Sequence, residues 1–375
     1  MPCLRPDVLR RLWPEPVEQG HGVDNCPTCG EFGPVSSAGD FERVWALVHD
    51  HPPGRHSPTA HYLLGGMYVQ GKGVDQDYAE GARWYRRAAE QGDVGAQQNL
   101  GHMHADGMGV EQDMQEAARW WQKAADQGNA ASRYELAAMY ANGDGVGKDP
   151  AEAARRHREN VGHAESEFQL GKHHEHGRGV AQDAREAARW FLKAADHEHA
   201  GAQYALALLL KDGRGVKQDH QAALEWYRKS ADQGHPQAQC DLGVMHWEGT
   251  HVKQDYREAL RWYRKAAGQG LANAQFCLGN MHLGGKGVGQ DPTEAIRWYE
   301  RAAGQGHTGA QFNLGTMLHT GSGATRDDRT AAQWLHEAAS QGHAHAQYVH
   351  TRPVRPLALC IHVCHAFMIN ACAHG

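Results

Sequence analysis

Apolar residues along this chain recur at the spacing of helices, in a pattern that the chain repeats. In one copy, Ala96, Leu100 and Met103 lie at i, i+4 and i+7, on one face of a helix. A second stripe runs from Ala117 to Ala125 at i, i+3, i+4, i+7 and i+8. Each copy therefore predicts two helices joined by a loop.

Eight copies follow one another at a nearly constant period. They begin at Ala60, Ala96, Ser132, Ser166, Ala202, Ala238, Ala274 and Ala310, and a partial copy begins at Ala346. Neighbouring starting points are 36 residues apart, except that Ser132 and Ser166 are 34 apart. A period of this length is typical of stacked supersecondary units. The predicted fold is therefore all-α, a right-handed α/α solenoid of about eight helix-hairpin repeats.

Glycines and acidic residues mark the helix ends in each copy. Gly107 follows the first stripe, and glycine ends a helix in the left-handed conformation without a Cβ clash. A second glycine, here Gly109, keeps the loop tight, and in the sixth copy His251 replaces it. Asp113 and Glu116 have the spacing of a capping box. We therefore expect both side chains to accept hydrogen bonds from free N–H groups where the second helix starts.

Each hairpin must depend on its neighbours for stability. Burying the recurrent tryptophan contributes roughly 4–6 kcal/mol at about 25 cal/mol per Å². The conformational entropy of the chain offsets most of that gain. One hairpin alone would be marginally stable, and stacking on both sides makes it stable.

The recurring residues resemble a known repeat family. The pattern A-Q-x-x-L-G-x-M-Y-x-x-G-x-G-V-x-Q-D-x-x-x-A-x-x-W-Y-x-K-A-A-x-Q-G is similar to the Sel-one-like repeat, a relative of the tetratricopeptide repeat with a longer loop. It matches at residues 60–92 and 274–306, among others, and covers about residues 60–350. The resemblance implies an adaptor that scaffolds protein complexes. Some bacterial relatives are reported to bind or hydrolyse β-lactams, which makes a β-lactam-binding hydrolase the alternative.

Composition and charge narrow the functional classes. The 375 residues carry a formal net charge of −6, and lysine and arginine are spread through every repeat. No basic block is present to bind phosphates, so we expect no nucleic-acid partner. Residues 1–20 contain no apolar signal-peptide segment, and no Asn-x-Ser/Thr acceptor occurs. The eight cysteines are scattered rather than paired in each repeat, which favours the cytoplasm over a secreted or periplasmic location.

The chain divides into four predicted parts. Residues 1–39 are rich in proline and glycine and read as largely disordered, 40–56 as a capping helix and turn, 57–350 as the repeat solenoid, and 351–375 as a C-terminal tail or cap. Leu357 to Cys372 is apolar but too short to span a membrane. In the third repeat, Arg156 and His157 replace the aromatic pair. That copy is either degenerate or a hinge, and a hinge predicts faster amide exchange in 150–165 than in 186–196.

Candidate chemistry is sparse. Cys26 and Cys29 have the spacing of a zinc half-site, and the alternative is that both are free thiols. The interval to His51 and His56 is longer than in a zinc finger, and the Cys/His residues after position 359 lie at the other end of the array. No Ser-x-x-Lys sequence or nucleophile elbow occurs. We therefore predict a protein that is not an enzyme and has no cofactor, apart from zinc at Cys26 and Cys29.

The predicted binding surface is the face of the first helices. Solenoids of this kind place the first helix on the concave side, and the fourth, seventh and eleventh residues of each copy differ while the core positions do not. From this stripe we predict contacts with a protein or peptide partner at Asn99, His102, Glu135, Lys172, Asp241, Asn280 and Asn313. The alternative is a solvated face with no partner. We expect the protein to be a monomer.

Overall fold

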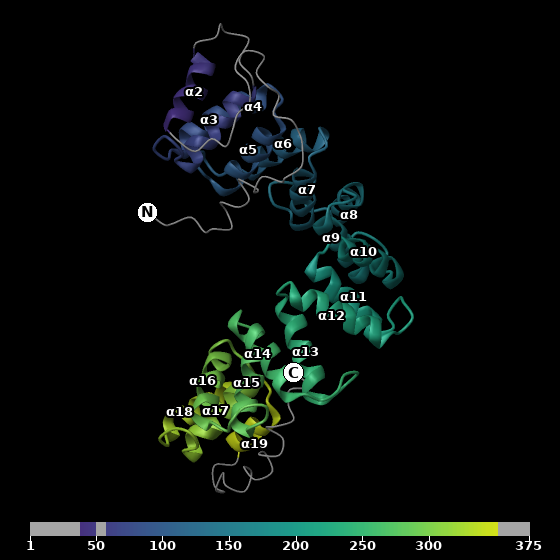
Figure 1. Ribbon diagram of the computed structural model, residues 1–375, viewed down its shortest axis with the longest axis vertical. Helices are drawn as coiled ribbons and strands as arrows, with labels where there is room; N and C mark the ends of the chain where they lie inside the picture. Colours follow the sequence, from purple (N-terminus) through teal and green to yellow (C-terminus); the bar gives the residue numbers. More distant parts are fainter. Residues whose placement is uncertain (1–37, 50–57, 352–375) are drawn as a thin grey trace. The chain divides into compact units, whose positions relative to one another are not determined.

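A computed structural model describes residues 38–49 and 58–351 of the chain (Figure 1). The described residues are all-α and form paired helix hairpins, so the predicted solenoid is confirmed. The chain contains two compact units, residues 1–183 and 184–375, and each is described by itself. The predictions for residues 1–37 and 352–375, including zinc at Cys26 and Cys29, lie outside the described residues.

Within the described residues of the first unit, α2 comes first and helix hairpins follow. Its helices are α2 (Ala38–His49), α3 (Pro58–Gln70), α4 (Tyr78–Glu90), α5 (Val94–Asp106), α6 (Met114–Asp126), α7 (Ala130–Asn142), α8 (Pro150–Glu159) and α9 (Ala164–His176). Val44 and Val48 of α2 are buried in one cluster with Leu64 of α3. The helix α2 therefore covers apolar side chains at the start of the first repeat.

The second unit continues the same alternation of first and second helices. Its helices are α10 (Ala184–Asp196), α11 (Ala200–Asp212), α12 (His220–Asp232), α13 (Pro236–Glu248), α14 (Tyr256–Gly268), α15 (Ala272–Gly284), α16 (Pro292–Gly304), α17 (Thr308–Thr320), α18 (Asp328–Ser340) and α19 (Ala344–Thr351). Figure 1 shows them following one another from teal through green to yellow.

The helix starts follow the prediction in part. The Asp113 carboxylate accepts hydrogen bonds from the N–H groups of Gln115 and Glu116, as predicted. The capping box was wrong in its second half, because the Asp113 N–H donates to the His104 carbonyl of the preceding helix at 2.8 Å. The Glu116 carboxylate instead accepts from Arg119 at 3.0 Å. Asp113 thus fixes both the start of α6 and its approach to α5.

The most completely buried rings are those that follow the recurrent tryptophan. Five of them are 0% exposed: Tyr85, Phe191, Tyr227, Tyr263 and Tyr299. A Cβ on Gly279 of α15 would lie 2.5 Å from the Tyr299 ring, so glycine in the first helix makes room for this ring. The tryptophans lie nearer the surface, where a cation covers them. Lys265 Nζ, for example, lies 4.2 Å from the Trp262 ring centroid.

Glutamine side chains join three successive helices. Gln239 of α13 donates to the Ala231 carbonyl in α12 at 3.0 Å and accepts from Gln269, which follows α14, at 2.9 Å. The same side-chain pair recurs as Gln127–Gln97, Gln233–Gln203, Gln305–Gln275 and Gln341–Gln311. Because each buried amide is paired, these bonds set the spacing of neighbouring hairpins.

The second loop glycine forms a contact between repeats, which we call the inter-repeat seam. A Cβ on Gly109 would lie 2.2 Å from the carbonyl carbon of Tyr78, the first residue of the preceding repeat's second helix. The equivalent glycines meet the equivalent residue, as Gly145–Met114, Gly179–Pro150, Gly215–Ala184, Gly287–Tyr256 and Gly323–Pro292. All have a positive φ. Glycine is therefore needed here for two reasons: it adopts this backbone conformation readily, and it has no side chain to clash with the preceding repeat.

The third repeat compensates for its missing aromatic pair. His157 is 2% exposed at the position of the buried ring. Asn160 Nδ2 donates to the Ala130 carbonyl at 2.9 Å and to Ser166 Oγ at 2.7 Å, across the shortened connection. The hinge in this repeat stays a prediction.

Substituting Gly109 with alanine tests the inter-repeat seam. We expect Gly109→Ala to lower the free energy of unfolding by about 2–4 kcal/mol, because it combines an unfavourable positive φ with overpacking against Tyr78. Gly128→Ala is the matched control, since its φ is +94° and no atom lies within 4 Å of an added Cβ. It should cost only about 1 kcal/mol. Equal urea unfolding midpoints for the two variants would rule out the seam.

Candidate functional site

The structure places the seven predicted contact residues in two environments. Four are buried, namely Asn99, His102, Asn280 and Asn313, and three are half-buried, namely Glu135, Lys172 and Asp241. The sequence pattern located a variable stripe of residues but did not predict how deeply each of them is buried. Variation along the stripe therefore includes packing residues as well as accessible ones, and the binding role of all seven stays a prediction.

The buried amides join neighbouring repeats. The Tyr299 hydroxyl donates to Asn280 Oδ1 at 2.6 Å. Asn313 Nδ2, from the next first helix, donates to the same oxygen at 3.3 Å. This bond satisfies the buried Tyr299 hydroxyl, which would otherwise cost free energy. Asn280 and Asn313 therefore hold α15, α16 and α17 together.

Asp241 is different because its carboxylate is only partly compensated. The Tyr204 hydroxyl of α11 donates to Asp241 Oδ2 at 3.2 Å. Burial raises the pKa of the Asp241 carboxyl, while the bond from Tyr204 and the charge of Lys211 oppose that rise. The Tyr204 ring stacks on His235 at 4.7 Å between centroids, which holds the hydroxyl in place. The carboxylate therefore lies in a weakly polar environment that favours a further positive charge.

A pocket of about 380 Å³ lies beside Asp241, on the first helices of the fifth to seventh repeats. We call it the first-helix pocket. Its lining is Lys211, Tyr227, Cys240, Asp241, Val244, Met245, Glu248, Thr250, His251, Asn273, Phe276, Cys277 and His307. The pocket combines an apolar floor with two carboxylates, which is the composition of a site for an amphipathic side chain.

The polar groups of the first-helix pocket have unused bonding capacity. The Tyr227 side chain is 0% exposed, and its hydroxyl has no hydrogen-bond partner among the described residues. Glu248 accepts from Thr250 Oγ1 at 3.0 Å, so a second acceptor site remains on the carboxylate. Lys211 lines the pocket, and its Nζ lies 4.0 Å from Oδ1 of Asp212, a residue outside the lining. The pocket thus presents the carboxylates of Asp241 and Glu248 to a ligand, while the Tyr227 hydroxyl is buried beneath its surface.

Sequence reasoning identified Asp241 but missed its two tyrosines. Tyr204 occupies the third position of its copy, where other copies have an aromatic residue such as Tyr62, Phe276 and Phe312. That recurrence is a usable signal for a ring on this face. The unpaired hydroxyl of Tyr227 has no such signal, because it depends on what surrounds the ring.

Two further kinds of site are absent from the part of the chain that the structure describes. Among residues 38–49 and 58–351, no group of three or more His, Cys, Asp or Glu side chains is arranged to hold a metal ion. Within the same residues, no helix is both long and apolar enough to cross a membrane.

Comparison with known proteins identifies the family. The model of the Sel1 repeat matches residues 58–93, 94–129, 130–155, 164–199, 200–235, 236–271, 272–307 and 308–343. The chain belongs to the Sel1 repeat family. Sel1 repeat proteins are generally protein-interaction scaffolds and are typically non-catalytic. No match was found among curated proteins.

Two solved structures are similar to this Sel1 repeat chain. One is c5321, a protective antigen of uropathogenic Escherichia coli with an SLR fold, at 35% identity and a TM-score of 0.69. That match covers 83% of this chain and 66% of the antigen. The other is a Sel1 repeat protein from Oxalobacter formigenes, at 29% identity and a TM-score of 0.63, covering 85% of this chain and 94% of that one.

The raised pKa of Asp241 predicts that neutralising this residue stabilises the protein. A carboxyl whose pKa is higher in the folded state favours folding below its unfolded pKa, and this benefit is lost as pH rises through the folded pKa. At pH 7 the charged form therefore destabilises the fold. We expect Asp241→Asn to raise the free energy of unfolding by about 0.5–1 kcal/mol at pH 7. Urea unfolding from pH 8 down to 4 should show the difference shrink, and a constant or negative difference would contradict this assignment.

Proposed function

We propose that this protein is a non-enzymatic scaffold that binds a segment of a protein partner in the first-helix pocket. The observation that supports the proposal most strongly is the desolvated Asp241 carboxylate, which lies with Glu248 in the lining of one pocket. A desolvated carboxylate costs free energy in the unbound protein. A cationic ligand that pairs with it recovers that cost, which is typical of a site whose function opposes stability.

The proposed ligand group is a lysine or arginine side chain of the partner. Its charge would lie between Asp241 and Glu248, and its methylene stem would pack on Phe276 and Val244 in the pocket lining. Lys211 also lines the pocket, where the Asp212 carboxylate, 4.0 Å from its Nζ, partly offsets its charge.

The location proposed for the protein is a reducing compartment, the cytoplasm. Cys240 and Cys277 both line the first-helix pocket, and both are buried and free of disulfides. An oxidising compartment would expose these thiols to disulfide exchange whenever the pocket opened.

Partner capture with matched variants tests the first-helix pocket. The double variant Asp241→Asn, Glu248→Gln removes both carboxylates of the pocket. The control, Asp75→Asn with Glu111→Gln, makes the same change of charge at exposed loop positions. Quantitative mass spectrometry after affinity purification should show specific partners retained by the wild type and the control. The pocket variant should recover them about tenfold less, since losing a desolvated ion pair costs 1.4 kcal/mol or more.

The result that contradicts this function is an unchanged set of partners for all three proteins, with circular dichroism showing equal helicity. The alternative, a β-lactam-binding hydrolase, is tested on the same samples. Steady turnover of a chromogenic β-lactam that scales with wild-type protein would replace the scaffold with an enzyme.

A further inference from the structure

One inter-repeat seam lacks the glycine on which the others depend. His251 occupies the loop position of Gly215 and Gly287, and its φ is +61°, a left-handed conformation that is unfavourable for a residue with a Cβ. At the equivalent glycines of the array, an added Cβ would lie 2.1–2.6 Å from the preceding repeat. The side chain of His251 therefore cannot be accommodated at that spacing from His220, the equivalent first residue of α12.

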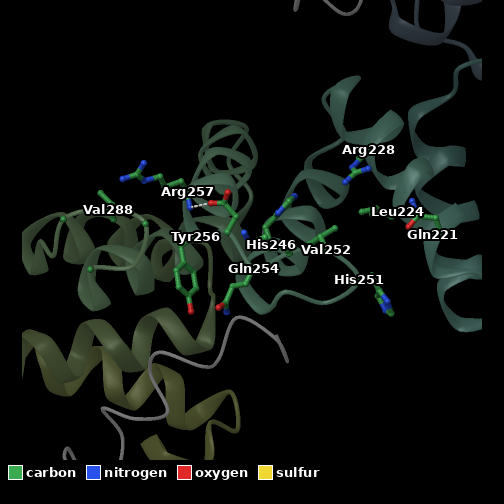
Figure 2. Close-up of a pocket in the computed structure, with 15 residues that line it drawn as sticks. Gln221, Leu224, Arg228, His246, His251, Val252, Gln254, Tyr256, Arg257 and Val288 are labelled. Atoms are coloured by element: carbon green, nitrogen blue, oxygen red, sulfur yellow. Dashed lines mark hydrogen bonds between the residues drawn. The ribbon is translucent and has the colours of Figure 1, made fainter.

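The two histidines meet through their rings instead. The rings of His220 and His251 stack at 4.0 Å between centroids, with an interplanar angle of 17°. Between α12 and the two following loops lies a hollow of about 1100 Å³, which we call the loop pocket (Figure 2). Its lining is Gln221, Leu224, Arg228, His246, His251, Val252, Lys253, Gln254, Asp255, Tyr256, Arg257, Gly285, Gly287, Val288 and Gly289. The loop pocket thus coincides with the altered seam.

Three cations line the loop pocket from three directions. Arg228 comes from α12, Lys253 from the loop and Arg257 from α14, and Figure 2 shows Arg228 and Arg257 on opposite sides of His246. All three are exposed, and among the described residues none of them forms an ion pair. Like charges around one hollow favour an anionic ligand.

The single carboxylate in the lining is already engaged. Asp255 caps α14 and accepts hydrogen bonds from the N–H groups of Arg257 and Glu258. These bonds, that from Glu258 above all, lower the pKa of the Asp255 carboxyl. Nearby, Glu258 lies 3.5 Å from Arg261, a residue outside the lining. Asp255 therefore stays ionised and offsets one of the three positive charges, and Arg257 and His246 act on it electrostatically, so the lining keeps a net positive charge.

This gathering of cations is particular to one seam. At five other seams, three residues occupy the positions equivalent to Arg228, Lys253 and Arg257. In that order, the sets are Arg86, Glu111 and Gln115; Gln122, Gly147 and Ala151; Leu192, Lys217 and Gln221; Arg264, Gly289 and Thr293; and Glu300, Thr325 and Arg329. At the seam between the third and fourth repeats the set is Arg158, Ala181 and Arg185, with two cations, and none of the other sets has more than one. The lost glycine and the three cations thus occur together.

We propose that the loop pocket binds an acidic peptide segment of a protein partner. The charge calls for carboxylates, which arginine binds in bidentate geometry. The volume is larger than a small ion needs, and Leu224, Val252 and Val288 offer apolar contacts between the cations. The loop backbone at Gly285, Gly287 and Gly289 lines the same pocket, so an extended chain has backbone groups to meet. This inference rests on the proposed function that the array binds protein segments, but it concerns a second pocket, whose lining shares only His251 with the first-helix pocket.

Fluorescence anisotropy with a short labelled polyglutamate peptide tests the loop pocket. The variant is Arg228→Glu, Lys253→Glu, Arg257→Glu. The control, Lys148→Glu, Arg158→Glu, Lys217→Glu, has the same net charge at scattered exposed sites. We expect the first triple variant to weaken binding at least about tenfold and the control less than about threefold, because only the former removes a local cluster. His251→Gly should also weaken binding, since it lets the seam close while keeping every cation.

Several outcomes would overturn the proposal. These are no binding by the wild type, equal loss in both triple variants, or full binding by His251→Gly. Tighter binding of a single-stranded oligonucleotide of equal charge would reassign the pocket to nucleic acid. Partner capture that depends on Asp241 and Glu248 tests the scaffold function independently of the loop-pocket proposal. If capture depends on those residues while polyglutamate does not bind, the loop-pocket proposal fails and the scaffold function stands.

Discussion

The close approach of a loop glycine to the backbone of the preceding repeat is the constraint on which this structure depends. Gly109 against Tyr78 and Gly287 against Tyr256 show the same contact in the two units. The contact tolerates no side chain, so it fixes how near one hairpin lies to the next. Paired glutamines such as Gln239 and Gln269 then satisfy the polar groups that this approach buries. Period, spacing and stacking thus follow from one backbone contact and one side-chain bond.

Both candidate sites arise where a residue departs from that repeated scheme. Asp241 places a carboxylate at a variable position of the first-helix face, where most other copies have uncharged residues such as Asn99, Cys277 and Asn313 and only Glu135 is also acidic. His251 replaces the seam glycine and stacks on His220 instead of allowing the close backbone contact. In a repeat protein each copy supplies a control for the others, so a departure with a structural consequence is a strong indication of function. The two departures lie in the same repeat, in two pockets that share His251.

The sequence predicted the fold well because local signals define each hairpin. Helical spacing gave the two stripes, and Gly107 ends α5 with a φ of +70° as expected. The reciprocal half of the capping box failed because the Asp113 N–H bonds to another helix, a contact that spacing within one helix does not reveal. The burial of Asn280 and Asn313 was missed for the same reason. Likewise, the unpaired hydroxyl of Tyr227 and the cluster around Arg228 depend on which helices meet.

Amide hydrogen exchange at two neighbouring seams tests the central claim most directly. One seam, between residues 249–255 and the start of α12, contains His251, and the next, between 285–291 and the start of α14, contains Gly287. If the glycine contact couples one repeat to the next, the amides of 220–224 and 249–255 should exchange faster than those of 256–260 and 285–291. Equal protection at the two seams would contradict the account.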